Sequence, residues 1–394
     1  MHGVWARGAP GAFPYTPVMD ARGTGRPSLL VFERGMLRSR RRRPIHGVEL
    51  FRLKFLRDAI SLGVEVTLVL ERSWEAHLPA YLGGRTPRLI RVPYVLSKGV
   101  TGLLAALMCR RTEADTLLIG APDESVAACV DLLLRTNRSH RVVISAEGEC
   151  GPRLQRALRR RPVTVVANSR YITDNWRGKF RGDLHESYGL ADAHQFHPPQ
   201  EAPRKQTVDF VLLAKLPSDA KGADIALEAF ALLPGPIRER CRLHLAGYVD
   251  PPPSPAPGVV THRWLAADAV GPFLRTMDVQ LVPSRWESFC QSAVQGMLTG
   301  LPLITSDISV LTDKLDTGGG IACRTAPEYA AAMERLALDA DLRRTMGEAG
   351  RAAALERYVY DPAGYLSRFF LPGRSFGAGA GAGAETLGAG VGGG

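Results

Sequence analysis

The chain has 394 residues, of which 45% are hydrophobic and 23% charged, and its net charge is +11. This length is too great for one compact core and predicts two domains, while the balanced composition excludes an intrinsically disordered protein. The longest uncharged apolar stretch, Val100 to Cys109, is about half of the ~20 residues that a membrane span requires, so we expect no transmembrane helix.

The cysteines and the amino-terminal sequence predict a cytoplasmic protein. Six cysteines are scattered along the chain without a C-x-x-C pair or a nearby histidine. This pattern favours reduced thiols over a disulfide framework or a zinc site. The first residues, MHGVWARGAPGAF, contain no apolar signal-peptide core, so nothing in them predicts export.

The basic charge has two interpretations. It predicts either a solvated surface rich in arginine or an anionic partner such as a nucleotide phosphate or a membrane face. The densest basic run, RSRRRRP, extends from Arg38 to Pro44. No aromatic residues alternate with these arginines, so a solvated or phosphate-facing loop is favoured over nucleic-acid binding.

The first half of the chain predicts one α/β domain over residues 27–196, after a flexible arm of residues 1–26. The segments SLLVFE, VEVTLVL, DTLLIGA, RVVISAEG and VTVVANS are typical of buried strands, and VELFRLKFLRDAISLG is typical of a helix that ends at Gly63. Alternating strands and helices indicate βαβ units and a parallel, doubly wound sheet.

The second half repeats this alternation after a proline-rich linker, residues 197–206. The segments VDFVLLAKL, GADIALEAFALL, CRLHLAGY, VQLVPS and LPLITSD predict a second domain over residues 207–355. We expect helices over 356–372 to pack back toward the first domain, and a flexible Gly/Ala tail over 373–394. The predicted fold class is α/β, with two Rossmann-like, doubly wound parallel-sheet domains that face a cleft at their carboxyl strand ends.

One group of candidate residues follows the first strand of the second domain. Lys215 ends the strand, and Lys221 with Gly222 opens a helix. A helix amino terminus exposes free N–H groups, so two ammonium groups that converge there are suited to a diphosphate. The alternative is that both lysines are solvated loop residues.

A second group lies in VPSRWESFCQSAVQGMLTGLPLI, from Val282 to Ile304. Glu287 precedes a helix and is suited to accept hydrogen bonds from sugar hydroxyls. Gln295, eight positions later, is suited to a ribose. We expect nearby backbone N–H groups to bind a hydroxyl or phosphate, namely those of Ser288, Phe289 and Cys290. The alternative is that Glu287 satisfies the helix dipole and Gln295 is a surface amide.

Together with VVANSRYITDNW and YGLADAHQFHP, these segments resemble the GT-B glycosyltransferases of glycosyltransferase family 4, also called glycosyl transferases group 1. The resemblance covers about residues 28–370. It implies transfer of a hexose-type sugar from a nucleotide diphosphate sugar, with uridine diphosphate the expected carrier. It also implies retention at the anomeric carbon, without a metal ion or other cofactor.

The resemblance assigns roles to matching positions. Lys215 stands where the family has arginine, and Lys221 matches its lysine, so both are expected to contact the diphosphate. Glu287 matches the first family glutamate, which faces the donor sugar, and Gln295 replaces the second, which holds the ribose. In PIHGVELF, Gly47 matches a glycine that lets the backbone approach the phosphates.

Glu147, in VVISAEGEC, stands where the family has histidine beside the donor sugar. It is expected either to bond the donor sugar or acceptor, or to form an ordinary salt bridge. Without an obvious carboxylate nucleophile, retention implies a front-face reaction in which the leaving phosphate oxygen accepts the acceptor proton.

Acidic residues at strand ends of the first domain bear on the acceptor. Four carboxylates near a cleft predict a small cationic acceptor, as in aminoglycoside antibiotic biosynthesis: Asp123, Glu124, Glu147 and Glu149. Their alternative role is helix capping.

Two other functions stay open. The run Arg38–Arg43 beside a helix over Val48 to Leu62 is suited to an anionic membrane and to a lipid or cell-envelope acceptor. A nucleotide-sugar epimerase or a non-catalytic sugar-binding protein is the alternative of another class.

Overall fold

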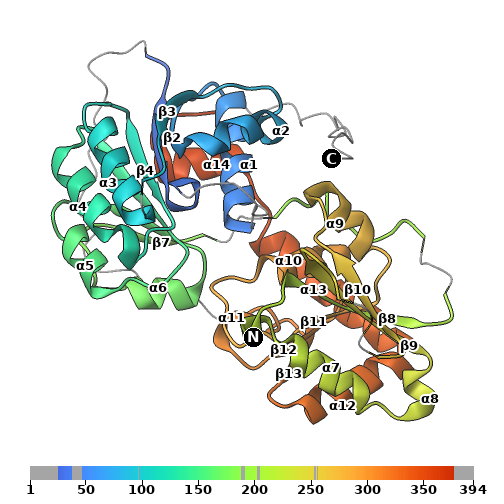
Figure 1. Ribbon diagram of the computed structural model, residues 1–394. Helices are drawn as coiled ribbons and strands as arrows, with labels where there is room; N and C mark the ends of the chain where they lie inside the picture. The colour runs from blue at the N-terminus through green and yellow to red at the C-terminus, as the bar shows by residue number, and fades with distance from the viewer. Residues whose placement is uncertain are drawn as a thin grey trace, which may run out of the picture.

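The computed structural model describes residues 25–37, 47–95, 97–187, 191–201, 205–252, 254 and 256–376. Two parallel sheets form two domains, and the chain crosses between them twice (Figure 1). This arrangement confirms the predicted fold class. The predictions for most of the amino-terminal arm, for Arg38–Arg43 and for nearly all of the carboxy-terminal tail lie outside the described residues.

The amino-terminal sheet has seven strands in the order β3-β2-β1-β4-β5-β6-β7, and every pair is parallel. Its chain order reverses between β1 and β4, which is where doubly wound sheets bind ligands. The strands are β1 Ser28–Glu33, β2 Glu65–Glu71, β3 Arg88–Val92, β4 Thr116–Gly120, β5 Arg141–Ala146, β6 Thr164–Ala167 and β7 Leu184–Glu186.

Helices cover both faces of this sheet because its central strands are apolar on both sides. Four helices pack on one face: α3 (Lys98–Cys109), α4 (Ala127–Thr136), α5 (Pro152–Leu158) and α6 (Arg170–Trp176). The other face is covered by α1 (Gly47–Ser61), α2 (Leu78–Leu82), α14 (Pro362–Tyr365) and a π-helical turn, Leu366–Phe370. The carboxy-terminal segment thus completes the core of the amino-terminal domain.

Helix α1 is a core helix. Phe51, Phe55 and Leu56 are buried in the same core as the π-helical turn, and the Phe55 and Phe370 ring centroids lie 4.9 Å apart. Because Phe51, Phe55 and Leu56 are already buried, these side chains are not available to a membrane. The expected membrane contact rests on Arg38–Arg43, which lie outside the described residues, so it stays a prediction.

The carboxy-terminal sheet has six parallel strands in the order β10-β9-β8-β11-β12-β13. The strands are β8 Val208–Leu216, β9 Cys241–Tyr248, β10 Val259–Arg263, β11 Val279–Val282, β12 Leu303–Ser306 and β13 Gly320–Cys323. Helices α7 (Ala223–Ala231) and α12 (Ala326–Leu338) pack on one face. Helices α9 (Ala267–Leu274), α10 (Gln291–Thr299) and α13 (Ala340–Arg357) pack on the other. The short helices α8 (Gly235–Arg238) and α11 (Ser309–Thr312) complete the domain.

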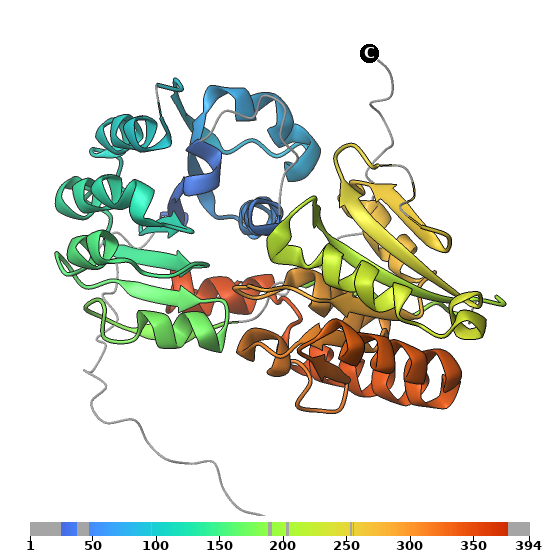
Figure 2. The same cartoon turned by 60° about the horizontal axis from the view of Figure 1, so that its bottom comes forward.

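The two chain crossings between the domains pair with each other. Ala191 N–H donates to the Tyr358 carbonyl at 3.2 Å, and Tyr360 N–H donates to the Ala191 carbonyl at 3.0 Å. After the second crossing, α14 lies beside α1 in the amino-terminal domain, as the red segment of Figure 2 shows. The paired crossings therefore join the domains on one side.

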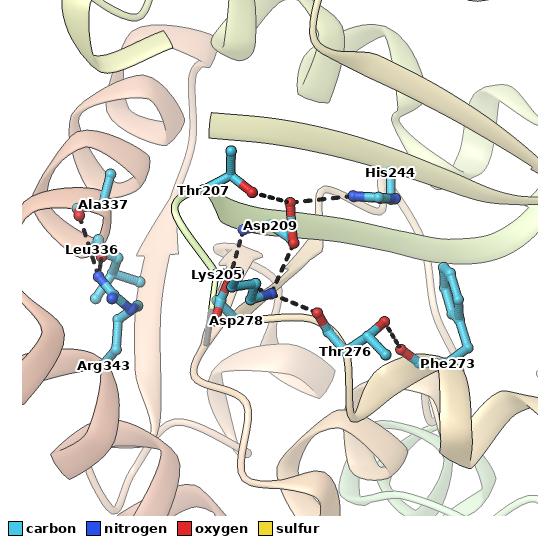
Figure 3. Close-up of polar contacts among 10 residues, drawn as sticks. All are labelled: Lys205, Thr207, Asp209, His244, Phe273, Thr276, Asp278, Leu336, Ala337 and Arg343. Atoms are coloured by element: carbon cyan, nitrogen blue, oxygen red, sulfur yellow. Dashed lines mark hydrogen bonds and ion pairs between the residues drawn. The ribbon is translucent and has the colours of Figure 1, made fainter. Parts of the chain in front are cut away.

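A polar cluster fixes the end of the linker to the carboxy-terminal domain (Figure 3). Lys205 Nζ lies 2.8 Å from Asp209 Oδ2 and 2.7 Å from Asp278 Oδ2. Asp209 also faces His244, whose Nδ1 lies 2.9 Å from His262 Nε2. Burial alone would raise the pKa of Asp209, but hydrogen bonds from His244 and Lys205 lower it to about 2. The cluster lies where β8 and β11 begin, at the opposite end of the strands from their carboxyl ends.

We predict that Asp209→Asn destabilises the protein because it removes a carboxylate that is ionised more readily in the folded state. The lowered pKa corresponds to about 2 kcal/mol of unfolding free energy at pH 7. This contribution is present above the unfolded-state pKa, near 3.8, and is lost as the pH falls toward 2. Urea unfolding should show the variant's deficit shrinking below pH 4.

The matched control is Asp174→Asn, which removes a carboxylate from the exposed pair with Arg177. Its unfolding free energy should stay close to that of the wild type, since exposed pairs contribute little. A deficit for Asp209→Asn that does not change with pH would contradict the ionic explanation.

Candidate functional site

A cavity of about 230 Å³ lies between the two domains at the carboxyl ends of their strands. The carboxyl ends of β5, β6 and β7 line it from one domain, together with α1 and α14. The turn after β8, the loop after β11 and the start of α10 line it from the other. The lining residues are Phe51, Ser145, Glu147, Val166, Asn168, Ser187, Lys221, Glu287, Ser288, Phe289, Cys290, Gln291 and Tyr365. Both halves of the chain therefore contribute polar groups to one site.

Two loops of the carboxy-terminal domain are tied together beside this cavity. The first is the turn 218–222 after β8, and the second is the loop 283–290 after β11. Arg285 N–H donates to the Ala220 carbonyl at 2.9 Å, and the Arg285 guanidinium holds both carboxylate oxygens of Asp224 at 2.9 and 2.6 Å. The two candidate groups found in the sequence are thus parts of one structure.

Gly222 allows the two loops to approach closely. Its φ of +67° is in the left-handed region, and a Cβ atom at this position would lie 2.0 Å from the Pro283 carbonyl oxygen. A side chain here would meet backbone rather than a flexible group, so the turn would have to move away. This contact sets how far Lys221 stands from the second loop.

Lys221 and Glu287 form an ion pair at the cavity wall. Lys221 Nζ lies 2.6 Å from Glu287 Oε1, which also accepts a hydrogen bond from Ser284 Oγ at 2.9 Å. The Glu287 side chain is 10% exposed and that of Lys221 is 26% exposed, so both remain accessible from the cavity. The site therefore presents a partly exposed cation beside a more buried carboxylate.

The amino terminus of α10 faces the same cavity. Cys290 precedes the helix with a left-handed φ of 64°, and its side chain makes no capping hydrogen bond to the first N–H groups among the described residues. Phe289 anchors the loop, because its ring is buried against Tyr358 at 5.8 Å and lies 4.6 Å from the ammonium group of Lys314. Uncapped N–H groups at a helix start attract anions.

On the opposite wall, one guanidinium is shared between two buried carboxylates. Arg52 Nε lies 2.9 Å from Glu33 Oε2, and Arg52 Nη2 lies 3.1 Å from Glu147 Oε1. The side chains of Glu33 and Arg52 are fully buried, and that of Glu147 is 8% exposed. Gly120 makes room for Glu33, since a Cβ there would lie 1.8 Å from Glu33 Oε2.

Glu147 lines the cavity and has one buried carboxylate oxygen without a partner among the described residues. Its Oε1 accepts from Arg52 and from Ser145 Oγ, whereas its buried Oε2 has no partner among the described residues. Burial raises the pKa of this carboxyl to about 7, although the charge of Arg52 opposes the shift. A carboxylate with this pKa and a free oxygen is suited to accept a hydrogen bond or proton from a ligand.

The other expected donor-site residues lie outside this lining. Lys215 is exposed near the end of β8, Gly47 is the first residue of α1, and Gln295 is half-buried on α10. None of these three, nor Gly222, is among the residues that line the cavity. Of the two lysines expected to converge on a diphosphate, Lys221 is the one that lines the cavity.

All four carboxylates expected at the acceptor side have partners within the protein. Asp123 pairs with Arg34 and accepts from Ser125 N–H, and Glu149 accepts from the Tyr171 hydroxyl. Glu124 accepts from two N–H groups at the start of α5. Only Glu147 of this group lines the cavity.

Sequence reasoning missed several residues of the site. Arg52 and Glu33 each lie in a largely apolar stretch of sequence. Nothing in such a stretch shows which distant residue the charged side chain pairs with. Tyr365 reaches the cavity from α14, more than 70 residues after Glu287 in the chain. Asn168 was part of the segment VVANS, and its buried Oδ1 has no partner in the described part of the chain, but nothing in the sequence distinguishes it from a turn residue.

Comparison with known proteins supports this picture of the carboxy-terminal domain. Residues 207–339 match the family model described as "Glycosyl transferases group 1". This match covers the two tied loops and about a third of the chain. No curated protein matches the sequence.

Solved structures match nearly the whole chain. Sucrose-phosphate synthase from Thermosynechococcus elongatus is 14% identical, with a TM-score of 0.68 over 85% of this chain and 95% of that one. HepE of Anabaena in complex with UDP-glucose is 14% identical, with a TM-score of 0.64 over 84% and 95%. WaaG, a glycosyltransferase involved in lipopolysaccharide biosynthesis, is 14% identical, with a TM-score of 0.61 over 87% and 99%.

The chain has the GT-B fold. In this GT-B chain the paired crossings at Ala191 and Val359 join the two domains, and the cavity lies between them.

We predict that Gly222→Ala lowers the unfolding free energy more than an alanine substitution does at another glycine with a positive φ. Gly178 also has a positive φ, +73°, but a Cβ atom there would meet no atom of the described residues within 4 Å. Gly178→Ala should therefore cost only the left-handed backbone penalty, about 1–2 kcal/mol. Gly222→Ala should add about 1–3 kcal/mol from the contact with Pro283.

Urea unfolding measures both costs. Equal unfolding free energies for the two variants would show that the close approach of the loops does not constrain the fold.

Proposed function

We propose that the protein transfers a sugar from a nucleotide diphosphate sugar to a hydroxyl group of an acceptor, with retention at the anomeric carbon. The observation that carries this proposal is the position of Lys221 beside the uncapped start of α10, in a cavity between two GT-B domains. The proposed carrier is UDP. It is supported by the likeness to HepE, whose structures contain UDP and UDP-glucose.

The donor diphosphate would bind between Lys221 and the N–H groups at the start of α10. Lys221 would then exchange its contact with Glu287 for one with a phosphate oxygen. Glu287, still held by Ser284, would accept hydrogen bonds from sugar hydroxyls. A cation and a helix start together offset the charge that grows on the leaving diphosphate, so the proposed reaction requires no metal ion.

In the proposed reaction the acceptor oxygen bonds to the anomeric carbon as the bond from that carbon to the phosphate oxygen breaks. Both events occur on the same face of the sugar. The acceptor proton passes to the leaving phosphate oxygen, and the nucleoside diphosphate departs. A covalent glycosyl-enzyme trapped on Glu287 or Glu147 would contradict this route.

Glu147 is the proposed acceptor-side residue. Its unpartnered Oε2 is suited to accept a hydrogen bond from the attacking hydroxyl. Glu33 and Glu147 share the single guanidinium of Arg52. When Glu147 is ionised, two carboxylates face one positive charge, so one negative charge is not neutralised. This excess is the remaining support for a small amine-bearing acceptor in natural-product biosynthesis, since the other three carboxylates lie outside the cavity lining.

We predict that Lys221→Met abolishes most of the stabilisation by UDP. At 100 times its dissociation constant a ligand stabilises a protein by about 2.7 kcal/mol. Loss of one charge-assisted hydrogen bond, about 1.5–3 kcal/mol, should weaken UDP binding by roughly 10-fold to 100-fold. The measurement is a thermal-shift titration with UDP, repeated with EDTA.

The variant Lys215→Met tests the second lysine in the same titration. A loss as large as that of Lys221→Met would assign Lys215 to the diphosphate as well, and no loss would remove it from the site. Full UDP affinity in Lys221→Met would contradict the proposed donor site.

We predict that sugar transfer rises with pH until about pH 7. The pKa of Glu147 is raised to about 7, so its carboxyl is mostly protonated below this pH and ionised above it. If the ionised form accepts a hydrogen bond from the attacking hydroxyl, log(kcat/KM) should increase with unit slope up to about pH 7 and then level off. Glu147→Gln should lower kcat/KM and remove this dependence.

The matched control is Glu149→Gln, two residues along the chain and outside the cavity lining. It should keep the wild-type pH profile. Retention of that profile by Glu147→Gln would show that another group titrates.

A further inference from the structure

Helix α3 exposes a row of large apolar side chains. Twelve large hydrophobic side chains are exposed among the described residues, and five of them fall between Tyr94 and Met108. Four of the five lie on α3, and their exposed fractions are Val100 41%, Leu103 36%, Leu107 43% and Met108 45%. Isolated exposed hydrophobic residues are normal, but a cluster indicates an interaction surface.

The exposed row is a second apolar face on one helix. Ala105, Ala106 and Cys109 pack into the domain core, as the spacing of an amphipathic helix requires. The residues at 100, 103 and 107 follow the same helical spacing on the outer side, where a surface helix normally carries polar residues. Figures 1 and 2 both show α3 on the side of its domain that faces away from the other domain.

The charges around this face are mostly positive. Residues 76–112 contain six lysines and arginines and no aspartate or glutamate. Arg110 and Arg111 are exposed directly after α3, and Arg88 is exposed on β3, the edge strand against which α3 packs. Nearby Arg91 pairs with Glu75, and Asp131 of α4 pairs with Arg135 and Arg160. The acidic Glu113 follows the arginines, so the basic excess is local to α3 and β3.

We propose that α3 docks on the surface of an anionic lipid bilayer. An interfacial helix has an apolar face that enters the headgroup region, with basic residues beside it that attract anionic lipids. Among the described residues no helix has both the length and the apolar character needed to cross a bilayer, so contact through α3 would be peripheral. A second copy of the chain is a poorer occupant, because its own α3 surface would bring the same positive charges.

The proposal does not depend on sugar transfer, but it bears on the acceptor. The start of α3 packs against the turn Glu124–Val126 at the carboxyl edge of the sheet, the edge on which the cavity lies. Docking through α3 would therefore hold the acceptor side of the cavity near a membrane. This favours the lipid or cell-envelope acceptor over the small cationic one.

The test is co-sedimentation of the full chain with vesicles of phosphatidylcholine, with and without 30% phosphatidylglycerol. We expect binding to the anionic vesicles and at least tenfold weaker binding to the neutral ones. The double variant Leu103→Ser/Leu107→Ser should bind the anionic vesicles at least tenfold more weakly than the wild type. Arg110→Gln/Arg111→Gln should also bind more weakly and lose much of its salt dependence.

The matched control is Leu232→Ser/Leu338→Ser, which removes two leucines of similar or greater exposure from the other domain. It should bind the anionic vesicles like the wild type. All variants change exposed side chains, and an unchanged UDP thermal shift confirms that each is folded and keeps its donor site.

Three results would overturn the proposal. Wild-type protein that does not sediment with anionic vesicles has no such surface, and undiminished binding by Leu103→Ser/Leu107→Ser places the contact elsewhere. A wild-type dimer in sedimentation velocity that this variant dissociates would identify a second copy of the chain as the occupant.

Discussion

The contact between the turn 218–222 and the loop 283–290 is the constraint on which the candidate site depends. Gly222 lies directly against the Pro283 carbonyl, and Arg285 bridges the two segments through the Ala220 carbonyl and Asp224. Lys221 and Glu287 meet because of this packing, although 66 positions separate them in the chain. The same packing orients the start of α10 toward the cavity.

The two walls of the cavity differ in the charged groups that they present. On the carboxy-terminal wall, an accessible lysine and uncapped N–H groups suit an anion. On the amino-terminal wall, Arg52 is buried between Glu33 and Glu147, so positive charge is already neutralised and a carboxylate oxygen is left without a partner among the described residues. A diphosphate on one side and a hydroxyl-bearing acceptor on the other are the ligands that these walls fit.

The sequence predicted the central strands well and the sheet edges poorly. The segments VDFVLLAKL and CRLHLAGY coincide with β8 and β9, because strands buried on both faces are continuous apolar runs. The strands that were missed, β3, β7, β10 and β13, all lie at sheet edges, where exposure interrupts the apolar pattern. For the site, local motifs indicated Lys221 and Glu287. Asp123 and Glu147 pair with Arg34 and Arg52, which are distant in the chain, and Glu124 accepts from the start of α5. The local sequence therefore could not show which of these acids lines the cavity.

The most direct test of the account is a crystal structure of the protein with UDP. The account predicts the diphosphate within hydrogen-bonding distance of Lys221 Nζ and of the backbone N–H groups at the start of α10. A diphosphate bound away from these groups, or UDP located outside the cavity between the domains, would contradict it.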